Sequence, residues 1–212
     1  MAALVCAGVT FASAQNWEIV PGKNVGPITA DTSEVQLIAI YGRENVKRMN
    51  IDVGEGEVQP GTVIFPNDVK RKAQILWRDP ATRAQPESVM IRDKGTLWKT
   101  DRGITIGTTL KTIEELNGRP FVLTGFGWDY SGTLMHANGG RVVELGKKVN
   151  EDEVRDRTLL LRLEPTAAMQ ETPEFFKVMD YLTFLSSDPS MQKLDPSVYE
   201  MIIEFPLRPG IR

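Results

Sequence analysis

The chain has 212 residues, of which 41% are hydrophobic and 25% are charged, a composition typical of globular proteins. This composition excludes a disordered chain, and the length allows either one sizeable domain or two compact halves. The 28 acidic and 25 basic residues are interleaved and give a net charge of −3, so no basic stripe exists for a nucleic-acid partner.

The first 15 residues, MAALVCAGVTFASAQ, predict a signal peptide for export. They are apolar and uncharged, and residues 12–14 form the Ala-x-Ala pattern that signal peptidase accepts. No Lys or Arg precedes the apolar stretch, so a buried N-terminal strand or helix is the alternative. Cys6, the single cysteine, lies inside this segment, and the bulky Val5 before it makes a lipidation site a poor match. No later run approaches the roughly 20 apolar residues of a spanning helix, so we expect a periplasmic or extracellular protein without disulfides or a transmembrane segment.

An internal repeat is the main organisational feature of the sequence. Residues 28–46 align with residues 104–122 without a gap, at a constant separation of 76 positions. Six aligned pairs are identical: Ile28/Ile104, Thr29/Thr105, Thr32/Thr108, Gly42/Gly118, Arg43/Arg119 and Val46/Val122. We interpret this as a duplicated unit. The prediction is an α+β protein of two tandem modules, residues 16–100 and 101–212, each a short helix packed on an antiparallel sheet.

Each copy carries signals for a two-turn helix. The hydroxyl pairs at 32–33 and 108–109 can cap the helix N-termini. In the first copy, a capping box is predicted from Ser33 with Gln36, or from Asp31 with Glu34. A glycine ends each helix, and each helix has one apolar stripe that can cover a sheet. The glycines are Gly42 and Gly118, and the stripes are Leu37 with Ile40 and Ile113 with Leu116.

Strand signals follow each helix, separated by glycine and proline. They lie at residues 62–65, 73–77, 120–128, 157–163 and 198–205, with a turn at residues 130–133. Residues 172–187 fit a helix that begins at Thr172 and Pro173, and a strand ending at Ser186 and Ser187 is the alternative.

The second repeat copy also carries a resemblance. The pattern G-[IV]-x-[IL]-G-[TS]-[TS]-L, followed by N-G-x-P-F, spans residues 103–121 and precedes Gly125 to Tyr130. It resembles a family of uncharacterised secreted bacterial proteins. More distantly, the duplicated capped helix leading into a sheet is similar to the tandem modules of β-lactamase-inhibitor-like and outer-membrane-assembly lipoprotein domains. That resemblance implies action by protein contact and not by catalysis, although this chain lacks the cysteines of those modules.

The side chains needed for common catalytic and metal sites are scarce. His136 is the only histidine, which argues against a multi-histidine metal site, and no G-x-S-x-G motif presents a serine nucleophile. The glycine pairs at 54–56 and 125–127 lack the remainder of a phosphate-binding motif. Asp52 with residues 54–57 could hold calcium, but the spacing favours an acidic turn. We therefore predict no catalytic residue, no metal site and no cofactor.

The most distinctive segment contains three aromatic residues and a carboxylate at residues 126–130. Strand alternation would place Phe126, Trp128 and Tyr130 on one face and Asp129 on the other. This face is either the core of the second sheet or an exposed binding platform. For the platform, the predicted ligand-binding residues are Trp128, Asp129 and Tyr130, with Asn138 and Arg141 across a hairpin.

These features favour a non-catalytic exported protein that binds a protein, a carbohydrate or another ligand of the cell envelope. The alternative is a carboxylate-dependent hydrolase acting on a carbohydrate or cell-wall substrate. Such an enzyme would pair Asp129 with Glu55 or Asp52. The sequence specifies neither the ligand nor the oligomeric state.

Overall fold

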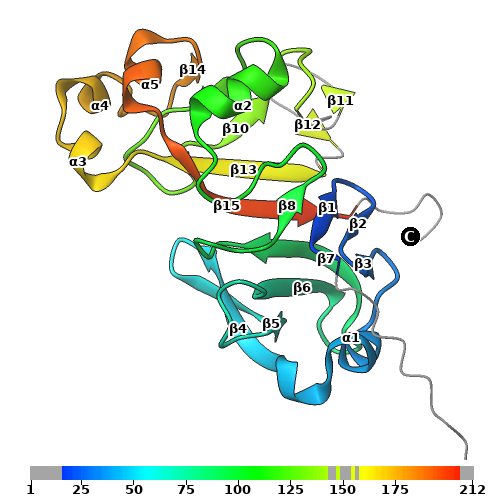
Figure 1. The fold of residues 1–212 in the computed structure, drawn as a ribbon. Coiled ribbons are helices and arrows are strands. Elements are labelled where there is room, and N and C mark those ends of the chain that lie inside the picture. Colours follow the sequence, from blue (N-terminus) through cyan, green and yellow to red (C-terminus); the bar gives the residue numbers. More distant parts are fainter. Residues whose placement is uncertain (1–15, 143–146, 149–153, 156–157, 206–212) are drawn as a thin grey trace, which may run out of the picture.

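The computed structural model describes residues 16–142, 147–148, 154–155 and 158–205. The predicted signal peptide, residues 1–15, lies outside these ranges together with Cys6. Within them the chain is a mixed α+β protein with short helices and mainly antiparallel strands, as predicted (Figure 1).

The N-terminal half begins with a small sheet and continues into a long antiparallel meander. Strands β1, β2 and β3 of the small sheet are joined by β8, which pairs in parallel with β1. Helix α1 and a short 3₁₀ turn at Arg43–Asn45 then lead into the meander. The bounds are β1 Glu18–Val20, β2 Asn24–Val25, β3 Ile28–Thr29, α1 Glu34–Tyr41, β4 Val46–Gly54, β5 Glu57–Ile64, β6 Ala73–Asp79, β7 Ala84–Ile91 and β8 Lys99–Thr100.

The C-terminal half begins with α2 and has shorter, interrupted strands. Helices α3, α4 and α5 and strand β14 lie between its two longest strands, β13 and β15. The bounds are α2 Leu110–Asn117, β9 Val122–Thr124, β10 Leu134–His136, β11 Lys147–Lys148, β12 Val154–Arg155, β13 Leu159–Glu164, α3 Ala167–Gln170, α4 Pro173–Lys177, β14 Thr183–Leu185, α5 Pro189–Leu194 and β15 Ser197–Glu204.

One antiparallel sheet joins the two halves. Its strand order is β13-β15-β7-β6-β5-β4, and β7 pairs with β15, for example Ile91 with Met201. A single hydrophobic core lies on one face of this sheet and includes Leu37 of α1 and Ile113 of α2. The structure therefore does not confirm two modules that each have a sheet of their own, because strands from both halves share one sheet and one core.

The two repeat helices nevertheless form matching local structures. Ser33 caps α1 by accepting from the N–H of Gln36, and Thr109 caps α2 by accepting from the N–H of Thr112. The capping box of Ser33 with Gln36 is confirmed. Each helix start also forms an isolated bridge with the first residue of a central strand, Ser33 with Ala84 of β7 and Thr109 with Ser197 of β15. Gly42 and Gly118 end the helices at positive φ, as predicted.

The predicted apolar stripes are correct only in part. Leu37 and Ile113 are fully buried, but Ile40 is 46% exposed. The buried face of α1 consists of Glu34, Leu37 and Tyr41, and that of α2 consists of Leu110, Ile113 and Asn117. The burial of Glu34 and Asn117 could not be predicted from the spacing of apolar residues, because both side chains are polar. Hydrogen bonds compensate their burial.

The predicted strands lie largely in β5, β6, β13 and β15, but two segments differ from expectation. Between residues 120 and 128 only Val122–Thr124 is a strand, and the chain then bends. Residues 172–187 contain both alternatives in succession, since α4 occupies Pro173–Lys177 and β14 occupies Thr183–Leu185. A single helix across that segment was therefore wrong.

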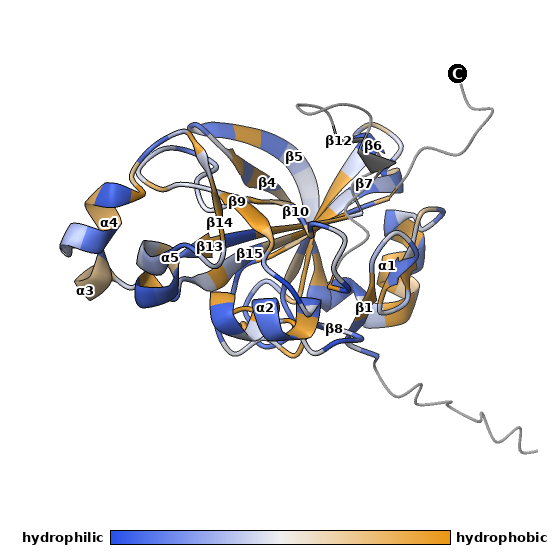
Figure 2. Cartoon of the chain, turned by 90° about the horizontal axis from the view of Figure 1, so that it is seen from above, coloured by the Kyte–Doolittle hydropathy of each residue, from blue (hydrophilic) through white to orange (hydrophobic). Residues whose placement is uncertain are grey.

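The second face of the central sheet is partly covered by the sheet itself. The β4–β5 hairpin arches across one side, whereas α2 and β8 lie on the other (Figure 2). Arg92, which follows β7, donates to the carbonyl oxygen of Asp52 near the hairpin tip at 3.0 Å. A small apolar cluster of Ile51, Val63, Leu76 and Met90 lies on this face. The strong twist of the sheet thus encloses a concave surface.

Candidate functional site

The structure divides the five predicted ligand-binding residues between the two ends of the β9–β10 hairpin. Trp128, Asp129 and Tyr130 lie in the loop that joins Thr124 to Thr133, where the two strands end. Asn138 and Arg141 follow the other end and lie beside the C-terminus of α2, where the Arg141 guanidinium packs over Gly118 and the Asn138 carbonyl accepts from Arg119. The structure therefore does not gather the five residues into one site.

The loop residues do not alternate as in a strand. Phe126 is buried in the core, where its ring stacks on Phe175 at 6.0 Å. Trp128 is half-buried, Asp129 is exposed, and Tyr130 has a positive φ of 61°. The expected alternation is wrong because this segment bends instead of extending, so each side chain has its own surroundings.

Trp128 belongs to an exposed apolar surface that includes the segment after α4. Its indole N–H donates to the carbonyl oxygen of Asp180 at 3.2 Å, and its ring lies 5.2 Å from that of Tyr181. Tyr181 is 76% exposed and Met179 is 47% exposed. Phe176 and Leu182, also exposed, flank them along the chain. We call the set Trp128, Phe176, Met179, Tyr181 and Leu182 the apolar patch.

Glycines allow the segment that carries the apolar patch to pack closely on the loop of Trp128. A Cβ atom on Gly125 would lie 2.4 Å from the carbonyl oxygens of Val178 and Asp180. On Gly127 it would lie 2.5 Å from Cγ of Met179. Two backbone hydrogen bonds complete the contact, from Phe126 to Val178 and from Gly125 to Leu182, each at 2.9 Å. Met179, Tyr181 and Leu182 are therefore exposed on a backbone segment that is held against the loop of Trp128.

Tyr130 lies in a second environment, against the β4–β5 hairpin. A Cβ atom on Gly54 would be 2.7 Å from its ring, and the guanidinium of Arg162 lies 4.5 Å from its ring centroid. Arg162 and Arg92 both bind Glu200, at 2.6 and 2.5 Å, and Glu200 is only 1% exposed. This buried ion-pair network links β13, β15 and the end of β7 to the hairpin and to the loop of Tyr130.

A second buried carboxylate, Glu34, is also ion-paired. It accepts hydrogen bonds from Arg48 at 2.6 Å and from Thr62 at 2.8 Å, and Arg83 lies 3.7 Å away. Burial acts to raise the pKa of Glu34, but the hydrogen bonds from Arg48 and Thr62 and the charges of Arg48 and Arg83 outweigh it. The pKa of Glu34 therefore lies below its usual value of 4.5. A carboxylate held in its ionised form cannot act as a general acid at neutral pH.

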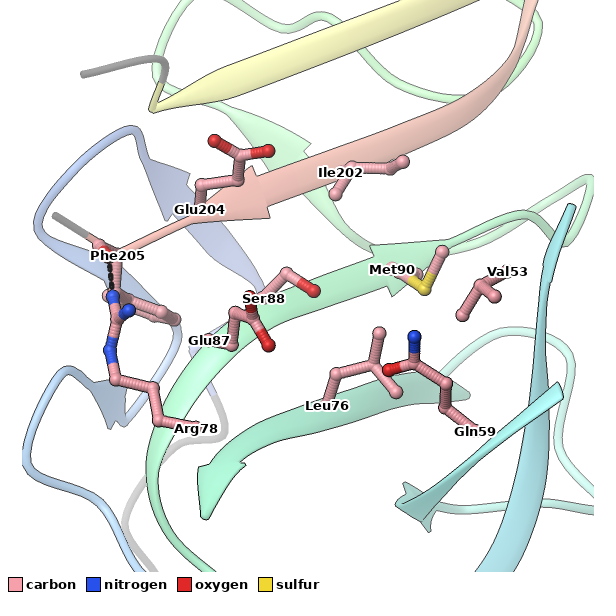
Figure 3. A pocket seen from close by; sticks show the side chains of 10 residues that line it. All are labelled: Val53, Gln59, Leu76, Arg78, Glu87, Ser88, Met90, Ile202, Glu204 and Phe205. Carbon is pink, nitrogen blue, oxygen red and sulfur yellow. Dashed lines mark hydrogen bonds between the residues drawn. The ribbon is translucent and has the colours of Figure 1, made fainter. Parts of the chain in front are cut away.

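The concave face of the central sheet contains an open pocket of about 350 Å³ (Figure 3). Residues of β4, β5, β6, β7 and β15, together with the adjoining Phe205, line it. No sequence pattern pointed to this pocket, because it is assembled from strands that are far apart in the sequence, such as those of Val53 and Glu204. The exposed part of the apolar patch did have a sequence signal, since large apolar residues recur between residues 175 and 185, but their spacing was interpreted as one face of a helix and not as an exposed surface.

The other residues considered for catalysis or metal binding are Asp52, Glu55 and His136. Asp52 caps its own turn by accepting from the N–H of Gly54 at 2.8 Å, and Glu55 lies in the turn between β4 and β5 with a φ of 55°. His136 is half-buried on β10 and has interactions of its own. Across the described residues, no group of three or more His, Cys, Asp or Glu side chains could hold a metal ion. In the same part of the chain, no helix has the length and apolar character to cross a membrane.

Comparison of the chain with protein-family models, with curated proteins and with solved structures found no significant match.

Proposed function

We propose that this protein is an exported, non-catalytic binding protein, and that a protein of the cell envelope docks on the apolar patch. The observation that carries the proposal is the exposure of Met179 and Tyr181 beside the half-buried Trp128, on backbone that is hydrogen-bonded to the loop after β9. Exposed apolar clusters of this kind are typical of interaction sites, and Trp, Tyr and Met are enriched in protein interfaces. The distant resemblance to modules that act by protein contact supports the same function.

The energetics of association favour such a surface. Trp and Tyr side chains bury about 150–250 Å² each. They are therefore common among the few residues that contribute most of the binding energy of an interface. Trp128 and Tyr181 are already held by the hydrogen bond to Asp180 and by their mutual ring contact. A partner would therefore order few additional rotamers on this side of the interface, which lowers the entropy that opposes association.

The neighbouring strand β14 adds backbone groups to the same region. It lies at the edge of the sheet β10-β9-β14. Because β14 pairs only with β9 among the described strands, alternate backbone groups along it point away from the sheet. Such groups at a sheet edge can pair with an extended segment of a partner.

Site-specific photo-crosslinking in the native cell envelope tests the proposal. A photoreactive phenylalanine analogue replaces Tyr181 in one variant and Val35 in a control. These two side chains are matched in exposure, at 76% and 75%. We expect a discrete crosslinked protein at position 181 and none at position 35. Absence of a crosslink at position 181, or the same crosslinks at both positions, would refute the docking surface.

One observation favours the alternative, a carboxylate-dependent hydrolase. Tyr130 contacts Gly54, so Asp129 lies in a loop that touches the hairpin of Asp52 and Glu55. Against this alternative, Asp52 is already engaged in capping its turn. Hydrolysis of a cell-wall polysaccharide that is abolished by Asp129→Asn, with the fold intact, would replace the binding proposal with the enzymatic one.

A further inference from the structure

We propose that Asn138 is a site of slow, spontaneous covalent modification, in which the backbone nitrogen of Gly139 attacks the side-chain amide of Asn138. The reaction converts the asparagine into aspartate or isoaspartate, with water as the co-reactant. It is independent of the apolar patch, because Asn138 follows the end of the β9–β10 hairpin that lies beside the C-terminus of α2.

The reaction has two steps. In the first step, the Gly139 nitrogen forms a bond to Cγ of Asn138 while the bond from Cγ to Nδ2 breaks. The Nδ2 group leaves as ammonia and takes the proton of the Gly139 nitrogen, so the product is a five-membered succinimide ring. In the second step, water opens one of the two carbonyl–nitrogen bonds of the ring, which gives either aspartate or isoaspartate. Glycine favours the attack because it has no Cβ that hinders the approach.

The sequence contains the Asn-Gly dipeptide twice, at residues 117–118 and 138–139. The local chemistry of the two pairs is the same, so their rates should differ only through their surroundings in the fold. Asn138 and Gly139 are exposed, and their φ values of 51° and 72° are both positive. Two positive φ values are typical of the type I′ turn, in which Asn-Gly is a preferred pair.

The groups that react at Asn138 are accessible. The Asn138 amide donates to the carbonyl oxygen of Pro120 at 3.4 Å, which is longer than a typical hydrogen bond. The turn is closed by a bond of 2.9 Å from the N–H of Gly140 to the carbonyl of Ala137. This bond joins the first and fourth residues of the turn and does not use the N–H of Gly139. Local opening of an exposed turn therefore brings the Gly139 nitrogen to the Asn138 amide at little cost.

Asn117 has the opposite surroundings and is 1% exposed. Its Nδ2 donates to the carbonyls of Arg119 and Ala137 at 2.8 and 2.9 Å, and its Oδ1 accepts from the N–H of Val142 at 3.1 Å. The N–H of Gly118 donates to two carbonyls of α2. Attack at Asn117 requires all these bonds to break, so we expect its rate to be at least about tenfold lower than that of Asn138.

The modification would change both the charge and the backbone of this region. Each product adds a carboxylate near Arg119, whose guanidinium donates to the Asn138 carbonyl at 3.3 Å. Isoaspartate also adds one carbon to the main chain inside the turn that Ala137 and Gly140 close. The Ala137 carbonyl accepts from Asn117, so a distorted turn would affect the C-terminus of α2.

Peptide mass spectrometry of the purified full chain tests the proposal after incubation in buffer and in denaturing urea. Cleavage by trypsin and by a protease that cuts before aspartate releases residues 112–128 and 129–141. Each peptide contains one amide side chain, Asn117 in the first and Asn138 in the second. In the folded chain, residues 129–141 should convert at least about tenfold faster than residues 112–128. In urea the two peptides should convert at similar rates.

The products and the pH dependence identify the attacking group. Attack by Gly139 yields isoaspartate together with aspartate, whereas direct hydrolysis of the amide yields aspartate alone. The rate at Asn138 should rise as the pH is raised above neutrality, because the Gly139 nitrogen must lose its proton. Equal rates of the two peptides in the folded chain, aspartate without isoaspartate, or a rate that does not rise with pH would overturn the proposal.

Discussion

Substitution of Glu200 by glutamine should strongly destabilise the central sheet. The Glu200 carboxylate is 1% exposed and binds Arg92 at 2.5 Å and Arg162 at 2.6 Å. Glutamine keeps the shape but removes the charge, which leaves two guanidinium groups facing each other without a counterion. Each charge-assisted hydrogen bond contributes about 1.5–3 kcal/mol, so the expected loss is about 3–5 kcal/mol, the range found when a buried ion pair is broken.

Urea unfolding followed by tryptophan fluorescence measures this effect. With a slope of about 1–3 kcal/mol per molar urea, the midpoint should fall by at least about 1 M. Glu174→Gln is the control, because Glu174 pairs with Lys193 at the surface, and its midpoint should change little. If both variants lowered the midpoint equally, the proposed importance of burial at Glu200 would be refuted.

Three further predictions concern the fold. The pKa of Glu34 is lower in the folded state than in the unfolded state, where it is 4.5. The ionised Glu34 therefore contributes fully to stability above pH 4.5, and this contribution is lost as the pH falls through the folded-state pKa. Urea-unfolding midpoints measured from acidic to neutral pH should show this loss, and Glu34→Gln should reduce the pH dependence. Gly132→Ala should prevent the native loop from forming, because the new Cβ would lie 1.9 Å from a backbone oxygen. Gly56→Ala is the control, because Gly56 has a similar positive φ but open space around it; thermal unfolding should show a destabilisation of only about 1–2 kcal/mol. Leu37→Ala and Ile113→Ala should each lower the stability of the protein by about 2–5 kcal/mol. Calorimetry should show a single unfolding transition for both variants, because both side chains belong to one core. Two separate transitions would contradict the shared core.

The sequence predicted the local structure of the repeat helices well. Both N-caps, the capping box and the terminal glycines are confirmed, because these signals depend on hydrogen bonds within four residues. The duplication of whole modules stays a prediction. The pairing of β7 with β15 could not be predicted, since it joins Ile91 to Met201 and depends on both halves packing together.

The candidate site was predictable only in part. Trp128 was identified from its aromatic and glycine-rich surroundings, but its partner Tyr181 comes from a segment whose conformation was ambiguous. The two rings meet only because Gly125 and Gly127 allow the segment after α4 to pack closely on the loop of Trp128. This packing is a tertiary contact that no local sequence pattern indicates. The pocket on the concave face gave no local signal, because strand register alone places Ser88 beside Glu204.

Methionine oxidation tests most directly whether the apolar patch is covered by a partner. Met179 lies in the patch and is 47% exposed, and Met49 on β4 is 48% exposed, so the two should oxidise similarly in the purified protein. Mass spectrometry after brief peroxide treatment would compare the purified chain with the chain in intact cells that produce it. We predict that Met179 is selectively protected in the cells while Met49 is not. An unchanged ratio of Met179 to Met49 oxidation would contradict the proposed docking surface.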